Sequence, residues 1–208
     1  MAAYTNCVSM DTIEPLLDFF QQMLPLDEKE QQLVRDTFRS RLYRRRQYVL
    51  QEGNVCTTLQ FVVRGCLRMY KIDEQGNIHI LQFAAENSWI NDLGSFHGLR
   101  PSQLNIDALE DTVVLQINRD DLVRLYIEAL KFNRIFRVLT ENHFVLLQER
   151  LLQNISSTAE ERYNRFFDHY PHLIGRLSQV QIAAYLGVSP EFLSRLRGRQ
   201  SKPGKEKS

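Results

Sequence analysis

Two kinds of hydrophobic periodicity divide the chain. Residues 10 to 40 repeat apolar positions at roughly helical intervals, and Pro25 separates two helical pieces. Residues 41 to 118 instead alternate apolar and polar positions, as around Leu59 and Phe61, with turn residues between the short runs. Many short strands with regular turns predict a sandwich, a roll or a barrel.

A long helix is predicted from about residue 130 to 154, and it carries two stripes. One stripe has heptad spacing and consists of Ile135, Leu139, Asn142, Leu146, Glu149 and Gln153. A neighbouring face carries Phe132, Phe136, His143, Leu147 and Leu151. Heptad spacing is typical of helices that pair with a second copy, so Ile135, Leu139, Asn142 and Leu146 are the predicted dimer seam. A single helix buried in a monomer fits the pattern equally well.

The C-terminal part predicts short capped helices. Thr158 with Glu161, and Ser178 with Gln181, have the spacing of capping boxes. In such a box the hydroxyl accepts from the N3 amide, and the N3 side chain accepts from the cap amide. The chain therefore divides near residue 155 into a helix-flanked β-domain and a small all-helical domain.

The stretch SQVQIAAYLGVSPEFLSRLRGRQ, residues 178 to 200, fits a helix-turn-helix. Gly187 suits the turn, because a left-handed backbone costs glycine little. Ser189 is a good N-cap, and Pro190 stands at the first helical position, where its missing donor does no harm. These features predict a second helix held across the first.

The second helix is expected to present polar side chains outward, because Leu193 and Leu196 point back to the core. The candidates for DNA contact are Ser189, Pro190, Glu191, Ser194, Arg195, Arg197 and Arg199. Arginine pairs bidentately with guanine and glutamate accepts from cytosine, so Arg195 and Glu191 are the expected base readers. Phosphate contacts are expected from Ser189, Ser194 and Arg197. A solvated surface charge explains Arg197 equally well.

The composition favours a cytoplasmic protein and argues against a secreted protein, a membrane protein, a metalloprotein and an enzyme. Three cysteines without metal-type spacing fit a reducing cytosol, so a cytoplasmic protein is expected. Asp11 and Glu14 stand where a signal peptide would need basic and apolar regions, and no apolar run could span a membrane. Histidines and carboxylates do not converge, and no activated nucleophile is seen, so neither a metal nor an enzyme is expected.

The chain resembles the Crp–Fnr family of bacterial transcription regulators over nearly all of residues 15 to 200. GNVCTTLQFVVRGCLRMYKIDEQGNIHILQF is similar to the family's cyclic-nucleotide-binding β-roll, with Gly53, Gly65 and Gly76 at its turns. TAEERYNRFFDHYP and QIAAYLGVSPEFLSRLR are similar to its DNA-binding domain. The resemblance implies an α+β fold: a double-stranded jelly-roll sensor domain over 1–129, a dimerisation helix over 130–155 and a helix-turn-helix domain over 156–208.

The implied function is a sequence-specific DNA-binding regulator that acts as a homodimer on a roughly palindromic duplex. An activator of this kind would also contact RNA polymerase. The last fourteen residues carry six basic residues and one acid, so a basic tail is expected to supply phosphate contacts where the family often has a wing. The reduced or absent wing also favours the alternative, a ligand-binding or protein-interaction module without a specific DNA target.

The implied effector pocket departs from the family pattern. Members that bind cyclic nucleotide have Gly-Glu-Leu and Arg-Ser/Thr-Ala, and the matching segments here are Asn91-Asp92-Leu93 and Ser102-Gln103-Leu104. A buried phosphate without its arginine lacks charge neutralisation, and Arg100 lies two residues upstream. We therefore expect no cyclic AMP, and either another small-molecule effector or none. The candidate pocket residues are Asn91, Asp92, Leu93, Arg100, Ser102 and Gln103.

Overall fold

A computed structural model describes residues 10 to 200, with side chains from residue 12 to residue 198. The chain forms two compact units. Unit 1 runs to Lys71 and resumes over Leu81–Glu141, and unit 2 comprises Ile72–Ile80 and the chain from Asn142 onward. The division between the units falls within the long helix, after Glu141, whereas the boundary near residue 155 stays a prediction.

The secondary structure follows the predicted change of period. The helices are α1 (Met10–Met23), α2 (Glu28–Thr37), α3 (Leu93–Gly98), α4 (Arg119–Glu128), α5 (Lys131–Ser156), α6 (Ala159–His169), α7 (Gln179–Leu186) and α8 (Pro190–Gln200), with a 3-10 turn η1 (Pro171–Leu173). The strands are β1 (Arg39–Tyr43), β2 (Tyr48–Leu50), β3 (Thr58–Arg64), β4 (Leu67–Ile72), β5 (Ile78–Ala84), β6 (Trp89–Ile90), β7 (Asn105–Ala108) and β8 (Thr112–Asn118).

The strands form two four-stranded sheets, in the orders β1-β8-β3-β6 and β2-β7-β4-β5. Strand β8 pairs antiparallel with both β1 and β3, and β7 pairs antiparallel with both β2 and β4. The register places Phe61 opposite Leu115 in the first sheet and Met69 opposite Ile106 in the second. The predicted α+β fold with an N-terminal β-roll is confirmed.

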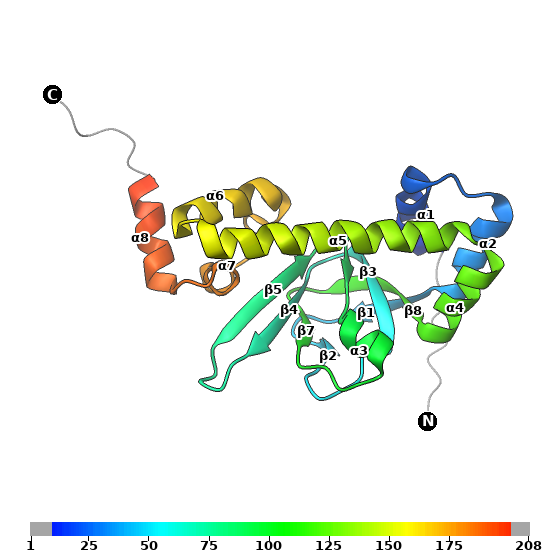
Figure 1. Ribbon diagram of the computed structural model, residues 1–208, viewed down its shortest axis with the longest axis horizontal. Coiled ribbons are helices and arrows are strands. Elements are labelled where there is room, and N and C mark those ends of the chain that lie inside the picture. The colour runs from blue at the N-terminus through cyan, green and yellow to red at the C-terminus, as the bar shows by residue number, and fades with distance from the viewer. Residues whose placement is uncertain (1–9, 201–208) are drawn as a thin grey trace. The chain divides into compact units, whose positions relative to one another are not determined.

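A cluster of aromatic rings packs the helices of unit 1 against the first sheet. The ring of Phe20 is fully buried and packs against the rings of Phe38, Trp89, Phe132 and Phe136, with centroids 5.4–6.3 Å apart. Figure 1 shows α1, α2 and α4 gathered around the N-terminal end of α5, which contributes Phe132 and Phe136. Burial of large rings contributes about 1.5–3 kcal/mol each, so this cluster holds α5 firmly.

The predicted dimer seam starts on the side of α5 that packs against the core of unit 1. Ile135 is 1% exposed within the single chain, and Leu139 packs against the same core. The β-domain of the same chain thus covers Ile135 fully and Leu139 in part. Asn142 and Leu146 are exposed and remain candidates.

A different row of apolar side chains is exposed on the C-terminal half of α5. We call it the α5 stripe, and it consists of Phe144, Leu147, Leu151 and Ile155. Its spacing of three, four and four residues keeps it on one face of the helix. At 3.6 residues per turn, the stripe lies roughly half a turn away from the face that carries Ile135 and Leu139.

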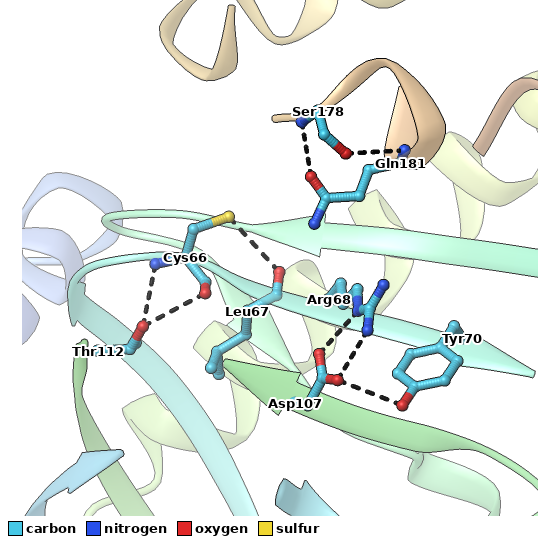
Figure 2. A network of polar contacts seen from close by, with 8 residues as sticks. All are labelled: Cys66, Leu67, Arg68, Tyr70, Asp107, Thr112, Ser178 and Gln181. Atoms are coloured by element: carbon cyan, nitrogen blue, oxygen red, sulfur yellow. Dashed lines mark hydrogen bonds and ion pairs between the residues drawn. The ribbon is translucent and has the colours of Figure 1, made fainter. Parts of the chain in front are cut away.

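Close approach of two strands requires glycine at residue 65. Gly65 has a φ of +105°, and a Cβ there would lie 2.5 Å from Thr112 Oγ1 and 2.7 Å from its Cα. The hydroxyl of Thr112 also accepts from the backbone N–H of Cys66 at 3.1 Å, as Figure 2 shows. Any larger residue at position 65 would therefore displace β8.

A largely buried ion pair joins β4 to β7. Figure 2 shows Arg68 donating twice to the carboxylate of Asp107, at 2.8 and 2.9 Å, while the Tyr70 hydroxyl donates to the same carboxylate at 3.2 Å. Burial disfavours the charge on Arg68, but its hydrogen bonds to Asp107 outweigh this and raise the Arg68 pKa. Burial, together with hydrogen bonding to Tyr48, raises the pKa of Tyr70. Removing one partner would destabilise the second sheet, because it would leave a buried charge without its partner.

Candidate nucleic-acid interface and effector pocket

Two capping boxes begin the helices of the C-terminal domain, as predicted. At the start of α6, Glu161 N donates to Thr158 Oγ1 at 3.3 Å and Thr158 N donates to the Glu161 carboxylate at 2.8 Å. At the start of α7, Gln181 N donates to Ser178 Oγ at 3.3 Å and Ser178 N donates to Gln181 Oε1 at 2.7 Å, as drawn in Figure 2. These bonds fix where each helix begins.

The turn between α7 and α8 has the geometry that the sequence predicts. Gly187 is left-handed, with φ 68° and ψ 37°, and it ends α7. The N–H of Phe192 donates to Ser189 Oγ at 3.2 Å, so Ser189 caps α8, which starts at Pro190. Leu193 is fully buried, and Figure 1 shows α8 running at a steep angle to α7. The predicted helix-turn-helix is therefore present in the structure.

The outward face of α8 carries the predicted contact residues. All of Ser189, Pro190, Glu191, Ser194, Arg195 and Arg197 are exposed. Glu191 stays ionised, because its own backbone N–H and the Ser189 hydroxyl hold its pKa below the usual value, with help from the charge of Arg195. The side chain of Arg199 lies outside the described residues, as do residues 201–208 of the predicted basic tail.

Arg150 ties the helix-turn-helix to α5 within unit 2. Its Nη2 donates to the carbonyl of Tyr185 at 3.1 Å and to the carbonyl of Ile80 at 2.7 Å. Its guanidinium also lies 4.0 Å from the centroid of the Tyr185 ring. A cation near the C-terminal end of a helix is favourable, and α7 ends one residue after Tyr185. Arg150 therefore positions α7 relative to the C-terminal half of α5.

The predicted effector loop is closed by its own hydrogen bonds. Asp92 caps α3, accepting from Ser95 N at 3.0 Å and from the Ser102 hydroxyl at 2.7 Å. Ser95 Oγ donates to the Arg100 carbonyl at 2.6 Å and accepts from Cys56 N at 2.9 Å. Ser102 is 3% exposed, so this carboxylate–hydroxyl contact is buried.

The remaining pocket candidates are dispersed. Leu93 packs against the core, and Gln103 is exposed. The side chain of Arg100 passes over two glycines of α3. Asn91 lines a cavity of about 40 Å³ with Val49, Leu50, Val55, Cys56, Thr57, Thr58, Gln60, Ile90 and Ile106. Ligand pockets are usually of the order of 300 Å³ or more, so this cavity suits a few waters rather than a nucleotide.

The polar groups around this cavity are neutral. Cys56 is a buried free thiol whose pKa is raised by burial. The Gln60 amide donates to the Thr58 hydroxyl, and its buried Oε1 has no partner among the described atoms. No three histidine, cysteine or carboxylate side chains within the described residues come together as a metal site would require.

Comparison with known proteins assigns the fold. Residues 40–128, from β1 to α4, match the family model of the cyclic nucleotide-binding domain. FixK2 from Bradyrhizobium japonicum superposes with a TM-score of 0.69 at 21% identity, covering 82% of this chain and 89% of FixK2. A transcriptional regulator of the Crp/Fnr family from Eubacterium rectale superposes with a TM-score of 0.67 at 19% identity, covering 88% of each chain. This chain has the Crp/Fnr fold.

A curated protein is also similar in sequence. Electron transport regulator A of Shewanella oneidensis is 27% identical over 169 residues, which cover 75% of this chain and 66% of that protein. Of the helices described here, none is long and apolar enough to cross a bilayer. The parts of this Crp/Fnr fold are the β-roll, the long helix and the helix-turn-helix.

Two residues of this Crp/Fnr fold are absent from the sequence-based candidates. Arg150 has no local signal, because its partners Ile80 and Tyr185 lie 70 and 35 residues away in sequence. Phe192 does have a signal, since an aromatic residue directly before the buried Leu193 must lie off the inward face of the helix.

The contacts of Arg150 lead to a stability prediction for α7. Arg150→Met keeps the aliphatic length of the side chain but removes its hydrogen-bond donors and its charge. The free energy of local opening of α7 should therefore fall by about 2 kcal/mol. Hydrogen exchange of the α7 amides should then be roughly 20- to 30-fold faster. Arg134→Met is the matched control, because Arg134 is exposed on the same helix, and it should leave α7 unchanged. Equal exchange in both variants would show that Arg150 does not position α7.

Proposed function

We propose that this protein is a sequence-specific DNA-binding transcription regulator that acts as a homodimer. The observation that carries the proposal is the fixed turn from α7 to α8, which leaves Glu191, Ser194 and Arg195 exposed on one helix. The relatives are named as regulators, and one is described as transcriptional. A helix of this kind enters the major groove with its N-terminal residues at base edges.

Arg195 and Glu191 are proposed as the base readers, and Arg197 as a phosphate contact. Arginine offers two parallel donors to the O6 and N7 atoms of guanine, which no other base presents. Glu191 stays ionised and can accept from the amino group of cytosine. Phosphate contacts carry no sequence information, so the three residues should differ in specificity rather than in affinity alone.

The α5 stripe is proposed as the dimer interface, in place of the predicted seam. Four apolar side chains in a row are between 48% and 75% exposed on one helix. Exposed apolar patches of this kind mark association surfaces, because water disfavours them. A second copy would present the same stripe, so two antiparallel or parallel α5 helices could cover each other. Two recognition helices would then address a roughly palindromic site.

Cyclic nucleotide is not proposed as the effector. A cyclic phosphate would need a cation, whereas Asp92 brings a negative charge to the Ser102 hydroxyl. The nearby cavity is also far smaller than a nucleotide. If an effector exists, it is a small molecule that does not depend on a buried phosphate.

The first experiment tests base reading. A duplex selected from a random-sequence pool with the wild-type protein is compared with a scrambled duplex by fluorescence anisotropy. Arg195→Ala should lose about 10- to 100-fold in affinity on the selected duplex and little on the scrambled one. Arg197→Ala should lose affinity similarly on both duplexes and reduce the salt dependence. Equal losses everywhere for both variants would remove Arg195 as a specificity residue, and a wild type without preference would remove the proposed function.

A second experiment tests the dimer. In sedimentation equilibrium the wild type should have twice the 24.5 kDa mass of the chain, and Leu151→Glu should approach the mass of one chain. Ile127→Glu is the matched control, because Ile127 is an exposed apolar residue on α4, outside the stripe. A monomeric wild type, or a Leu151→Glu variant that keeps the dimer mass, would contradict the interface.

A third experiment tests the effector loop. Titration with cyclic AMP or cyclic GMP at millimolar concentration, followed by calorimetry, should give no saturable heat. Among the six predicted pocket residues Arg100 alone is basic, so Arg100→Ala serves as the comparison. Saturable heat in the wild type that disappears in Arg100→Ala would show that a cyclic phosphate does bind, with Arg100 as its anchor.

A further inference from the structure

The first turn of α8 carries an apolar side chain among polar ones. Phe192 is 39% exposed, whereas the following residue, Leu193, is fully buried. Burying a phenylalanine is worth about 1.5–3 kcal/mol, so partial exposure on a helix with an available core is costly. The ring is therefore partly in solvent on the helix that carries the proposed base readers.

Other aromatic rings of the C-terminal domain pack against one another. Phe166 packs against Phe167, Tyr170 and Tyr185, with ring centroids 5.2–5.4 Å apart. Among the aromatic contacts within residues 10–200, none involves Phe192. This ring lies outside the aromatic cluster that holds the domain together.

The position of Phe192 on the helix is fixed. Its backbone N–H donates to Ser189 Oγ at 3.2 Å, so its Cα cannot drift at a fraying helix end. Arg195 lies three residues further along, and residues three apart are neighbours on a helix surface. The ring therefore stands beside the proposed guanine reader.

We propose that Phe192 is a specificity-determining residue that recognises the C5-methyl group of a thymine. This inference rests on the proposed function of DNA reading. In the major groove the thymine methyl is the one apolar group on a base edge, and an apolar side chain such as phenylalanine can contact it. A half-site should then contain a thymine close to the base that Arg195 reads.

Deoxyuridine tests this directly, because it differs from thymidine only by that methyl group. In the selected duplex each thymine of one half-site is replaced in turn by deoxyuridine, and the affinity is measured for each variant. For the wild type, at least one position should lose about fourfold in affinity, as expected for burial of one methyl group. Phe192→Ala should bind the thymine and uracil duplexes equally at that position.

The thymine-to-uracil ratio is measured within each variant, so a general loss of stability cancels. Phe192→Leu should retain part of the ratio, because leucine is apolar but smaller. Ile174→Ala is the matched control, since Ile174 is an exposed apolar residue before α7, and it should keep the full wild-type ratio.

Three results would overturn the assignment. One is a wild type that is insensitive to deoxyuridine at every position, and another is a Phe192→Ala variant that keeps the wild-type ratio. The third is a Phe192→Ala variant that has a lower oligomeric mass and an unchanged thymine-to-uracil affinity ratio. That result would show that the Phe192 ring contacts a second copy of the chain and not a thymine. A wild type that binds selected and scrambled duplexes equally would instead reject DNA reading itself, and Phe192 with it.

Discussion

Burial of the first turns of α5 in the aromatic core of unit 1 sets the rotation of this helix about its own axis. Phe132 and Phe136 both pack against Phe20, so the helix cannot turn without removing rings from the core. The same packing turns one side of the first half of α5 toward the core, where Ile135 is 1% exposed.

Local signals made the C-terminal domain predictable from the sequence. The capping boxes at Thr158 and Ser178 and the left-handed Gly187 each depend on residues within a few positions of one another. Such interactions can be recognised from spacing and residue type alone. The strands of the β-domain were predictable for a similar reason, since alternation with period two is a local property of a strand, whereas the choice of a roll came from the family resemblance.

The dimer seam was not predictable, because periodicity does not state what covers an apolar face. Ile135 and Leu139 satisfy heptad spacing, yet the β-domain of the same chain buries Ile135 and partly covers Leu139. A helix with apolar residues on two faces needs the tertiary structure to decide which face remains free. The role of Arg150 was hidden for the same reason, since its acceptors are carbonyl groups of distant residues, and carbonyl groups leave no mark on the sequence.

The bond between Ser102 and Asp92 has a consequence for the equilibrium affinity of any ligand that uses this loop. The hydroxyl is already engaged at 2.7 Å in a buried position, so a ligand that needs it must meet an opened loop. The apparent dissociation constant is then the intrinsic one divided by the open fraction. If about 1% of molecules were open, the apparent affinity would fall about 100-fold, and substitutions that loosen this bond would sensitise the protein without touching the ligand.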